Sequence, residues 1–222
     1  MTSAQLASAG TRLAAVGIAG VMLAGCGEKL SWNQKLVMKV ETPDGVVSGG
    51  SVIRVDLRYE PRLIAHQGGI VKKVTGESAF VEVRPGAYLF ALLGDEADRA
   101  RHTFFPVDAP DGAWDAYAAL SRLREARSLP RESYPRFVTF TNPSDPRTIS
   151  SVDPENLAAV FGPGYHLKSV LLEITDDPVG RDNVSRVLNW WNTLEVPIGG
   201  GIHRKYGDPL YGIGKWDFVR EQ

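Results

Sequence analysis

The segment VIRVDLRYEP, residues 52–61, decides the fold class because its side chains alternate strictly in character. From Ile53 to Tyr59 every second residue is apolar or aromatic, and charged residues fill the positions between them. Alternation with a period of two is typical of a strand that turns one face to the core and the other to water. The segment therefore predicts a half-buried strand of an antiparallel sheet.

The sequence on both sides of this segment continues as short strands separated by turns. Residues 36–47 predict a strand that ends at a turn over Pro43-Asp44-Gly45, whose residue types suit turn geometry. Residues 70–93 predict three further strands, with turns at Thr75-Gly76-Glu77 and Arg84-Pro85-Gly86. Five or so short strands with frequent turns indicate a meander or a small sandwich.

After Gly94 the pattern becomes mixed. Three helices and two strands are predicted, the helices beginning near Asp111, Asp153 and Asp182 and the strands covering residues 136–141 and 166–175. The second helix has the clearest signals, with Asp153 as N-cap, Pro154 at the first helical position and Gly162 as the stop. The tail from Val196 is rich in glycine, tyrosine and proline and is expected to pack as loops.

These patterns predict an α+β fold, with an N-terminal antiparallel β meander or small sandwich followed by a mixed helix and strand half. We expect one globular body over residues 35–222, β-rich over 35–94 and mixed over 95–222. Apolar residues make up 43% of the chain and charged residues 23%, which is ordinary globular composition. With 25 basic and 26 acidic residues, the chain has no electrostatic footprint for nucleic acid.

The first 25 residues have the layout of a secretory signal peptide. Arg12 precedes an uncharged apolar run, residues 13–24, and the only cysteine follows at position 26. Twelve helical residues span about 18 Å, well short of the roughly 30 Å hydrocarbon core of a bilayer. A short apolar run after a basic start favours a cleaved signal peptide over a transmembrane anchor. The alternative, a buried N-terminal helix, is disfavoured because nothing caps the run.

The stretch Leu23-Ala24-Gly25-Cys26 resembles the lipobox of bacterial lipoproteins. This resemblance implies cleavage between Gly25 and Cys26, a diacylglyceryl group on the Cys26 sulfur and acylation, such as palmitoylation, of the new amino terminus. Two or three acyl chains hold a protein firmly on a membrane. The residue after the cysteine is Gly27 rather than aspartate, which in that family implies the periplasmic face of the outer membrane.

The body resembles an uncharacterised family of proteobacterial membrane lipoproteins, through residues 40–55 (VETPDGVVSGGSVIRV), 88–93 (YLFALL) and the stretch 138–179. That resemblance implies the same location and no particular activity. Residues 26–34 are predicted to be the lipidated terminus and a short tether, which reaches at most about 30 Å when fully extended. The folded body is therefore expected to lie close to its membrane.

Motifs that carry chemistry are scarce. The four histidines, His66, His102, His166 and His203, lie 36 or more residues apart, so no metal site is predicted. Neither GxSxG nor SxxK is present. The candidates for a hydrolytic or ligand site are His166 and the pair Asp176 and Asp177, although Asp177 before Pro178 also suits a turn.

Two further stretches carry charged or glycine-rich sequences that suit binding, but both are predicted to be surface loops. The acids Asp95, Glu96 and Asp98 predict a solvated loop. Residues 199–201 are three glycines followed by His203, Arg204 and Lys205, a composition that could cradle a phosphate. Their spacing is not that of a phosphate-binding loop, so a surface loop is favoured.

The adjacent Trp190 and Trp191 are the candidate interface residues. In a helix their side chains diverge by about 100°. Either the tail, with Tyr211 and Trp216, covers both, or one of them is exposed and could bind a partner.

The sequence thus favours a non-enzymatic envelope lipoprotein without a cofactor, held in the membrane by lipid on Cys26, that binds an envelope protein or has a structural role. The alternative is an anchored hydrolase or small-ligand-binding protein, which would bring His166 and Asp176 together in one cleft.

Overall fold

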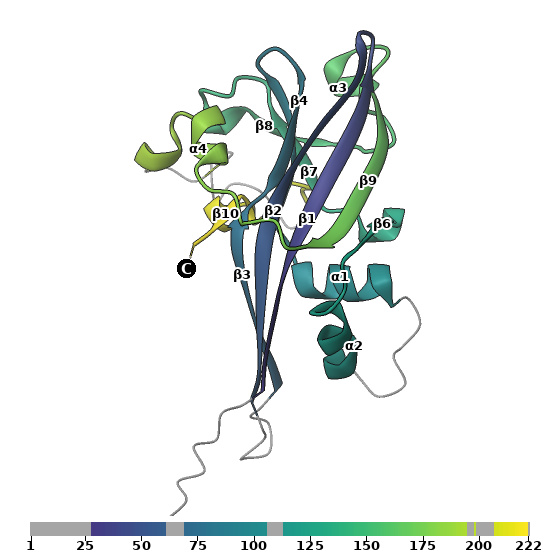
Figure 1. Cartoon of the computed structure of the whole chain (residues 1–222). Helices are drawn as coiled ribbons and strands as arrows, with labels where there is room; N and C mark the ends of the chain where they lie inside the picture. The colour runs from purple at the N-terminus through teal and green to yellow at the C-terminus, as the bar shows by residue number, and fades with distance from the viewer. Residues whose placement is uncertain (1–27, 61–68, 106–112, 195–197, 199–206, 222) are drawn as a thin grey trace, which may run out of the picture.

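The computed structural model describes residues 28–60, 69–105, 113–194, 198 and 207–221. Within these ranges ten strands form two antiparallel sheets, and four short α-helices lie around them (Figure 1). The protein is therefore sheet-rich with added helices. Strands from both halves of the chain are combined in each sheet, so the β-rich and mixed halves of the sequence do not form separate layers.

The larger sheet has six strands and is built around one long hairpin. Its strand order is β10 (Val219–Arg220), β3 (Gly69–Glu77), β2 (Gly45–Glu60), β1 (Lys29–Thr42), β9 (His166–Thr175) and β6 (Glu125–Ser128). The register of β1 and β2 runs from Lys29 opposite Arg58 to Thr42 opposite Gly45. The predicted turn over residues 43–45 is confirmed, with Gly45 at a φ of +123°.

The alternation in residues 52–60 separates the two faces of the larger sheet. Ile53, Val55 and Leu57 are buried on what we call the inner face. Arg54, Asp56 and Arg58 alternate with them and lie on the outer face. A half-buried antiparallel strand, as predicted from the sequence, is confirmed for this segment.

The smaller sheet is a buried middle layer. Its strand order is β4 (Ala79–Arg84), β5 (Ala87–Ala91), β7 (Phe137–Phe140) and β8 (Ile149–Val152). One core lies between it and the inner face of the larger sheet, and a second, rich in aromatic residues, lies against its other face. Because both faces are covered, all four residues of β7 are buried.

Two adjacent glycines in β2 allow close backbone approaches, Gly49 to the smaller sheet and Gly50 to β1 within the larger sheet. A Cβ atom on Gly49 would lie 2.1 Å from the backbone oxygen of Phe80 in β4. A Cβ atom on Gly50 would lie 2.4 Å from the backbone oxygen of Leu36 in β1. Glycine within a strand often marks such an approach of another backbone.

Two helices complete the cover of the inner face near the start of β1 (Figure 1). They are α1 (Glu96–Phe104) and α2 (Ala113–Leu120), and the ring of Tyr117 in α2 stacks on Trp32 in β1 at 6.1 Å. Residues 95–98 therefore begin a helix, and the prediction of a solvated loop is wrong. Asp95 caps this helix by accepting a hydrogen bond from the Asp98 backbone N–H, and Glu96 is 3% exposed.

The strand boundaries differ from the prediction at several places, including the start of β1 and the end of β3. β1 begins at Lys29, not near residue 35, because the Glu28 backbone oxygen already accepts a hydrogen bond from the Tyr59 N–H at 2.9 Å. The predicted tether over 26–34 is therefore mostly strand. Residues 75–77 belong to β3 rather than to a turn, and the chain leaves for the smaller sheet at Ser78.

The helix boundaries also differ. Asp111, near which the first predicted helix begins, lies outside the described residues. Residues 125–128, which follow α2, form β6 at the edge of the larger sheet. The second predicted helix is reduced to α3 (Ala158–Phe161), which does end at Gly162. The third is only α4 (Asn183–Val187), preceded by Asp182 at a φ of +62°. The tail is not all loop, since β10 pairs with β3.

Candidate functional site

The predicted catalytic candidates are far apart. His166 begins β9 and Asp176 follows its last residue, a separation of about 30 Å along a ten-residue strand. Asp176 is exposed and paired with Arg124, whose hydrogen bond lowers the pKa of that carboxyl group. Asp177 pairs with Lys35, with 3.0 Å between Nζ and Oδ2. The structure does not bring His166 and these aspartates into one cleft.

Other predicted residues lie outside the described ranges. These are Gly25 and Cys26, the histidines His66 and His203, and the glycine-rich stretch with Arg204 and Lys205. His102 is described and lies in α1, with its Nε2 atom 2.8 Å from the Arg101 guanidinium.

Trp190 and Trp191 are both buried, each at 8% exposure, so neither indole is available as an exposed interface residue. The Trp190 indole N–H donates to the Pro143 backbone oxygen at 2.7 Å, and Trp191 packs on Phe218 at 5.9 Å. The tail covers the pair through Phe218, whereas Trp216 is 63% exposed. The long helix expected here is broken after Val187.

A cleft with a volume of about 430 Å³ lies at the edge formed by β3 and β10. Its lining carries charges of both signs, including Glu77, Asp182 and Arg220. Asp182 is the only described non-glycine residue with a positive φ. This conformation has a structural role, because it lets the Asn183 N–H donate to the buried Glu77 carboxylate at 2.9 Å.

A more ordered constellation lies at the end of the larger sheet where β1 begins. The Glu28 carboxylate accepts a hydrogen bond from the Trp114 indole N–H at 2.6 Å, and its backbone oxygen is bonded to Tyr59. The rings of Tyr59 and Trp114 meet at 5.7 Å, and Tyr59 remains 42% exposed. We call Glu28, Tyr59 and Trp114 the tip cluster. It joins β1, β2 and α2 two residues after the predicted lipidation site.

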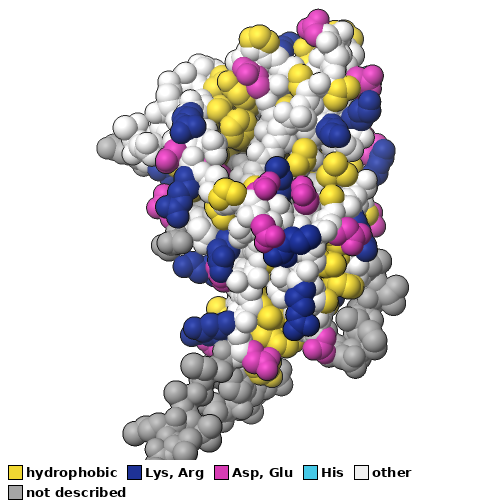
Figure 2. All heavy atoms as spheres, in the orientation of Figure 1, with side chains coloured by type: hydrophobic (Ala, Val, Ile, Leu, Met, Phe, Trp, Pro, Cys, Tyr) yellow, Lys and Arg dark blue, Asp and Glu magenta, His cyan; other side chains and the backbone are white. Residues whose placement is uncertain are grey.

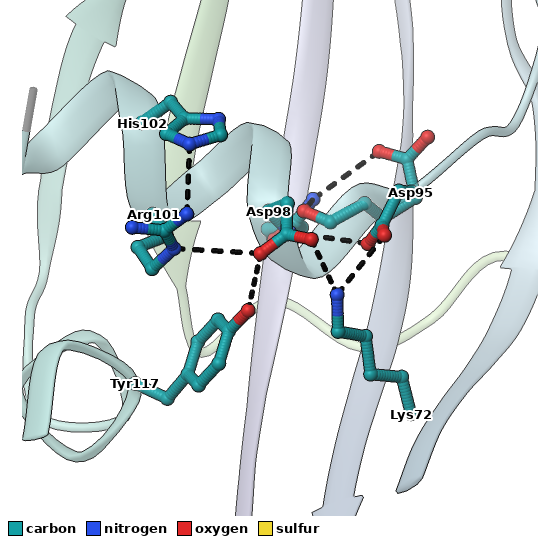
Figure 3. A network of polar contacts seen from close by, with 8 residues as sticks. Lys72, Asp95, Asp98, Arg101, His102 and Tyr117 are labelled. Atoms are coloured by element: carbon teal, nitrogen blue, oxygen red, sulfur yellow. Dashed lines mark hydrogen bonds and ion pairs between the residues drawn. The ribbon is translucent and has the colours of Figure 1, made fainter. Parts of the chain in front are cut away.

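A polar network holds α1 and α2 at this end of the sheet (Figure 3). Lys72 of β3 pairs with Asp95 at 3.0 Å and with Asp98 of α1. The Tyr117 hydroxyl of α2 donates to the same Asp98 carboxylate. The network thus ties three elements together and fixes α2, which carries Trp114.

The protonation of this network favours a structural role. Partial burial acts to raise the pKa of Asp98, but hydrogen bonds from Lys72 and Tyr117 outweigh it and hold the pKa far below its usual range. Burial and the bond to Asp98 both raise the pKa of Tyr117. Burial opposes the charge on Lys72, yet its two carboxylate partners raise its pKa. At neutral pH the groups therefore stay locked in complementary states rather than poised to exchange protons.

Asp98→Asn should destabilise the protein by about 1–2 kcal/mol at pH 7, because it weakens a partly exposed, charged hydrogen-bond network. The pKa of Asp98 is lower in the folded protein than its ordinary value of 3.8. The ionised Asp98 therefore contributes fully to the free energy of unfolding above about pH 3.8, and this contribution is lost as the pH falls through the lower folded-state pKa. Urea unfolding at pH 7 and pH 3 measures the difference in the free energy of unfolding between wild type and Asp98→Asn. This difference should be smaller at pH 3. Asp177→Asn, in an exposed pair, is the control, and an equal effect of both variants would contradict the prediction.

On the outer face of the same tip, the strand register gathers cationic side chains. Lys29, Arg58 and Val71 lie opposite one another in one row across β1, β2 and β3. Asp56 and Lys73 lie in the next row on this face. These residues line a groove of about 420 Å³, which we call the tip groove. Figure 2 shows Lys and Arg side chains beside apolar and acidic ones at the lower end of the molecule.

No protein family, curated protein or solved structure matches this chain. Among the described residues, no helix is long and apolar enough to cross a bilayer. In the same ranges, no three His, Cys, Asp or Glu side chains are grouped so that they could hold a metal ion.

The tip cluster and the tip groove have no local signal in the sequence. Glu28 and Trp114 are 86 residues apart, and only the fold brings them together. The cations of the tip groove come from three strands, so no run of basic residues marks them in the sequence.

Proposed function

We propose that this protein is a lipid-anchored envelope protein, held by acyl chains on Cys26, whose body rests on the membrane with the tip of its larger sheet. Its role there is binding or structural rather than catalytic. The lipobox residues 23–26 support the anchor, and Gly27 supports the periplasmic face of the outer membrane.

The observation that carries this proposal is the fixed position of Glu28. Its backbone and its side chain are both bonded, to Tyr59 and Trp114. Two residues of extended chain span at most about 7 Å. A lipid on Cys26 would therefore hold the tip cluster at the level of the headgroups, where tyrosine and tryptophan are favoured because their rings are apolar and their tips polar.

A tip held in this way suits a protein that presents a surface at a defined height above its membrane. The polar network of Lys72, Asp98 and Tyr117 supports the same role, since it stiffens the end nearest the predicted anchor. An envelope protein partner would then meet the body in a set orientation.

Cys26→Ala should abolish lipid attachment, because the thiol is the proposed acceptor of the diacylglyceryl group. We expect wild-type protein in the membrane fraction to begin at Cys26, with an intact mass raised by the lipid, and to incorporate radiolabelled palmitate. Incorporation should fall to background in Cys26→Ala and stay unchanged in the control Ser31→Ala, which alters an exposed residue five positions away. A mature wild-type chain with an unmodified Cys26 would refute the proposal.

A further inference from the structure

The tip groove places two like charges opposite each other in the strand register. Lys29 and Arg58 are directly opposite in the β1–β2 register, and Lys73 is one row further along the same face. Like charges opposite each other in an antiparallel pair destabilise the sheet. An anion in the groove would turn this repulsion into attraction.

Two of these three cations have no ion-pair partner among the described residues. Arg58 is paired with Glu60, and the nearby Arg54 is paired with Asp56. Within the described ranges, Lys29 and Lys73 form no ion pair. The neighbouring Lys72 differs, because it points to the other face and is held by Asp95 and Asp98 (Figure 3). Consecutive lysines thus have separate roles, one in the network and one at the groove.

The surroundings of the groove suit a lipid headgroup. Val71 lies among the cations and is 44% exposed, which adds an apolar contact beside the charges. The two rows of the groove cover about 7 Å along the strands. That is close to the thickness of one headgroup layer, and lysine and arginine can extend their charged ends along such a layer.

We propose that the tip groove binds phosphate groups of anionic phospholipids in the membrane that holds the Cys26 lipid. This inference rests on the proposed function, because the anchor brings the groove to the headgroups. The lipid fixes the protein to the membrane, and the groove sets its tilt and its preference for anionic membrane regions. Lys29, Arg58 and Lys73 supply the charge complementarity.

The test uses lipidated protein reconstituted into vesicles, with Val71→Cys as the only free thiol. We measure its rate of labelling by a membrane-impermeant maleimide on vesicles of pure phosphatidylcholine and on vesicles with about 30 mol% phosphatidylglycerol. We expect labelling to be about fivefold slower on the anionic vesicles, since each basic residue near such a surface is attracted to it. Asp44→Cys, at the opposite end of the β1–β2 hairpin, should show no difference.

Two triple variants, each made in the Val71→Cys background, isolate the role of the groove. Lys29→Gln with Arg58→Gln and Lys73→Gln should bring the ratio of the two rates near one. Lys39→Gln with Lys168→Gln and Arg186→Gln removes three exposed cations elsewhere and should keep the fivefold ratio. For each variant, the labelling rate on anionic vesicles is divided by its own rate on phosphatidylcholine vesicles. Differences in thiol reactivity between variants then cancel.

The outcomes separate the two proposals. If the protein is lipidated but is labelled at the same rate with and without phosphatidylglycerol, the proposed lipid binding by the groove is wrong and the proposed anchor is unaffected. An equal fall in the ratio of labelling rates in both triple variants would also contradict the groove proposal, because it would show that net charge alone attracts the protein to the anionic membrane. If inorganic phosphate slows labelling on pure phosphatidylcholine vesicles as much as phosphatidylglycerol does, the groove is a site for free phosphate instead. A chain without lipid on Cys26 refutes the proposed function and, with it, the inference.

Discussion

Gly49→Ala should destabilise the protein by about 3 kcal/mol or prevent folding, the upper part of the range for overpacked cores. The new Cβ atom would lie 2.1 Å from the Phe80 backbone oxygen and 2.7 Å from the Cα atom of Val81. Both are backbone atoms of β4, so no side-chain rotation can relieve the overlap. β2 and β4 would have to separate, which opens the core between the two sheets.

The effect is measured by urea unfolding followed by near-ultraviolet circular dichroism. Ser48→Ala is the matched control, because it lies next to Gly49 in β2, is exposed and adds no atom. We expect the control to change the free energy of unfolding by less than about 0.5 kcal/mol. If Gly49→Ala were as stable as Ser48→Ala, the close crossing of β2 and β4 would be wrong.

Parts of the fold that have local signals can be predicted from the sequence, whereas the close approach of two elements cannot. Local signals succeeded where one face of a strand meets water, as in residues 52–60, and where a turn has typical residues, as at 43–45. The bounds of β9 were also predicted correctly, because residues 166–175 stand between clear turn signals. A glycine within a strand often marks a close backbone approach, as Gly49 does here, but the element that approaches cannot be known from the sequence alone.

The errors have physical causes. Residues 95–98 resembled a solvated loop because three of the four are acidic, yet an N-cap followed by acids in the first turn is also a typical helix start. Glu96 is buried there because the Arg99 side chain pairs with it. β10 is only two residues long and depends on β3, so no local pattern could reveal it. The tip cluster and tip groove depend on strand register and on α2, which are tertiary features.

Phe218→Ala should destabilise the protein by about 3–5 kcal/mol, as expected for the loss of a fully buried phenylalanine. Phe218 is completely buried and contacts the rings of Phe90, Phe140 and Trp191 at 5.7–5.9 Å. Its backbone oxygen accepts a hydrogen bond from Ser78 N–H at 2.6 Å, at the point where the chain passes between the sheets. The side chain thus closes the second core, and its removal leaves a cavity that its rigid aromatic neighbours cannot fill.

The control for this prediction is Trp216→Ala, because Trp216 is a larger aromatic residue two positions earlier that is 63% exposed. We expect its effect to stay within about 0.5 kcal/mol. Tryptophan fluorescence gives a second measurement, since loosening the tail in Phe218→Ala should shift the emission of Trp190 and Trp191 to the red as water reaches their rings. If the two variants unfolded at the same urea concentration, the tail would not be the cover of the second core. Trp190 and Trp191 would then again be candidates for an interface.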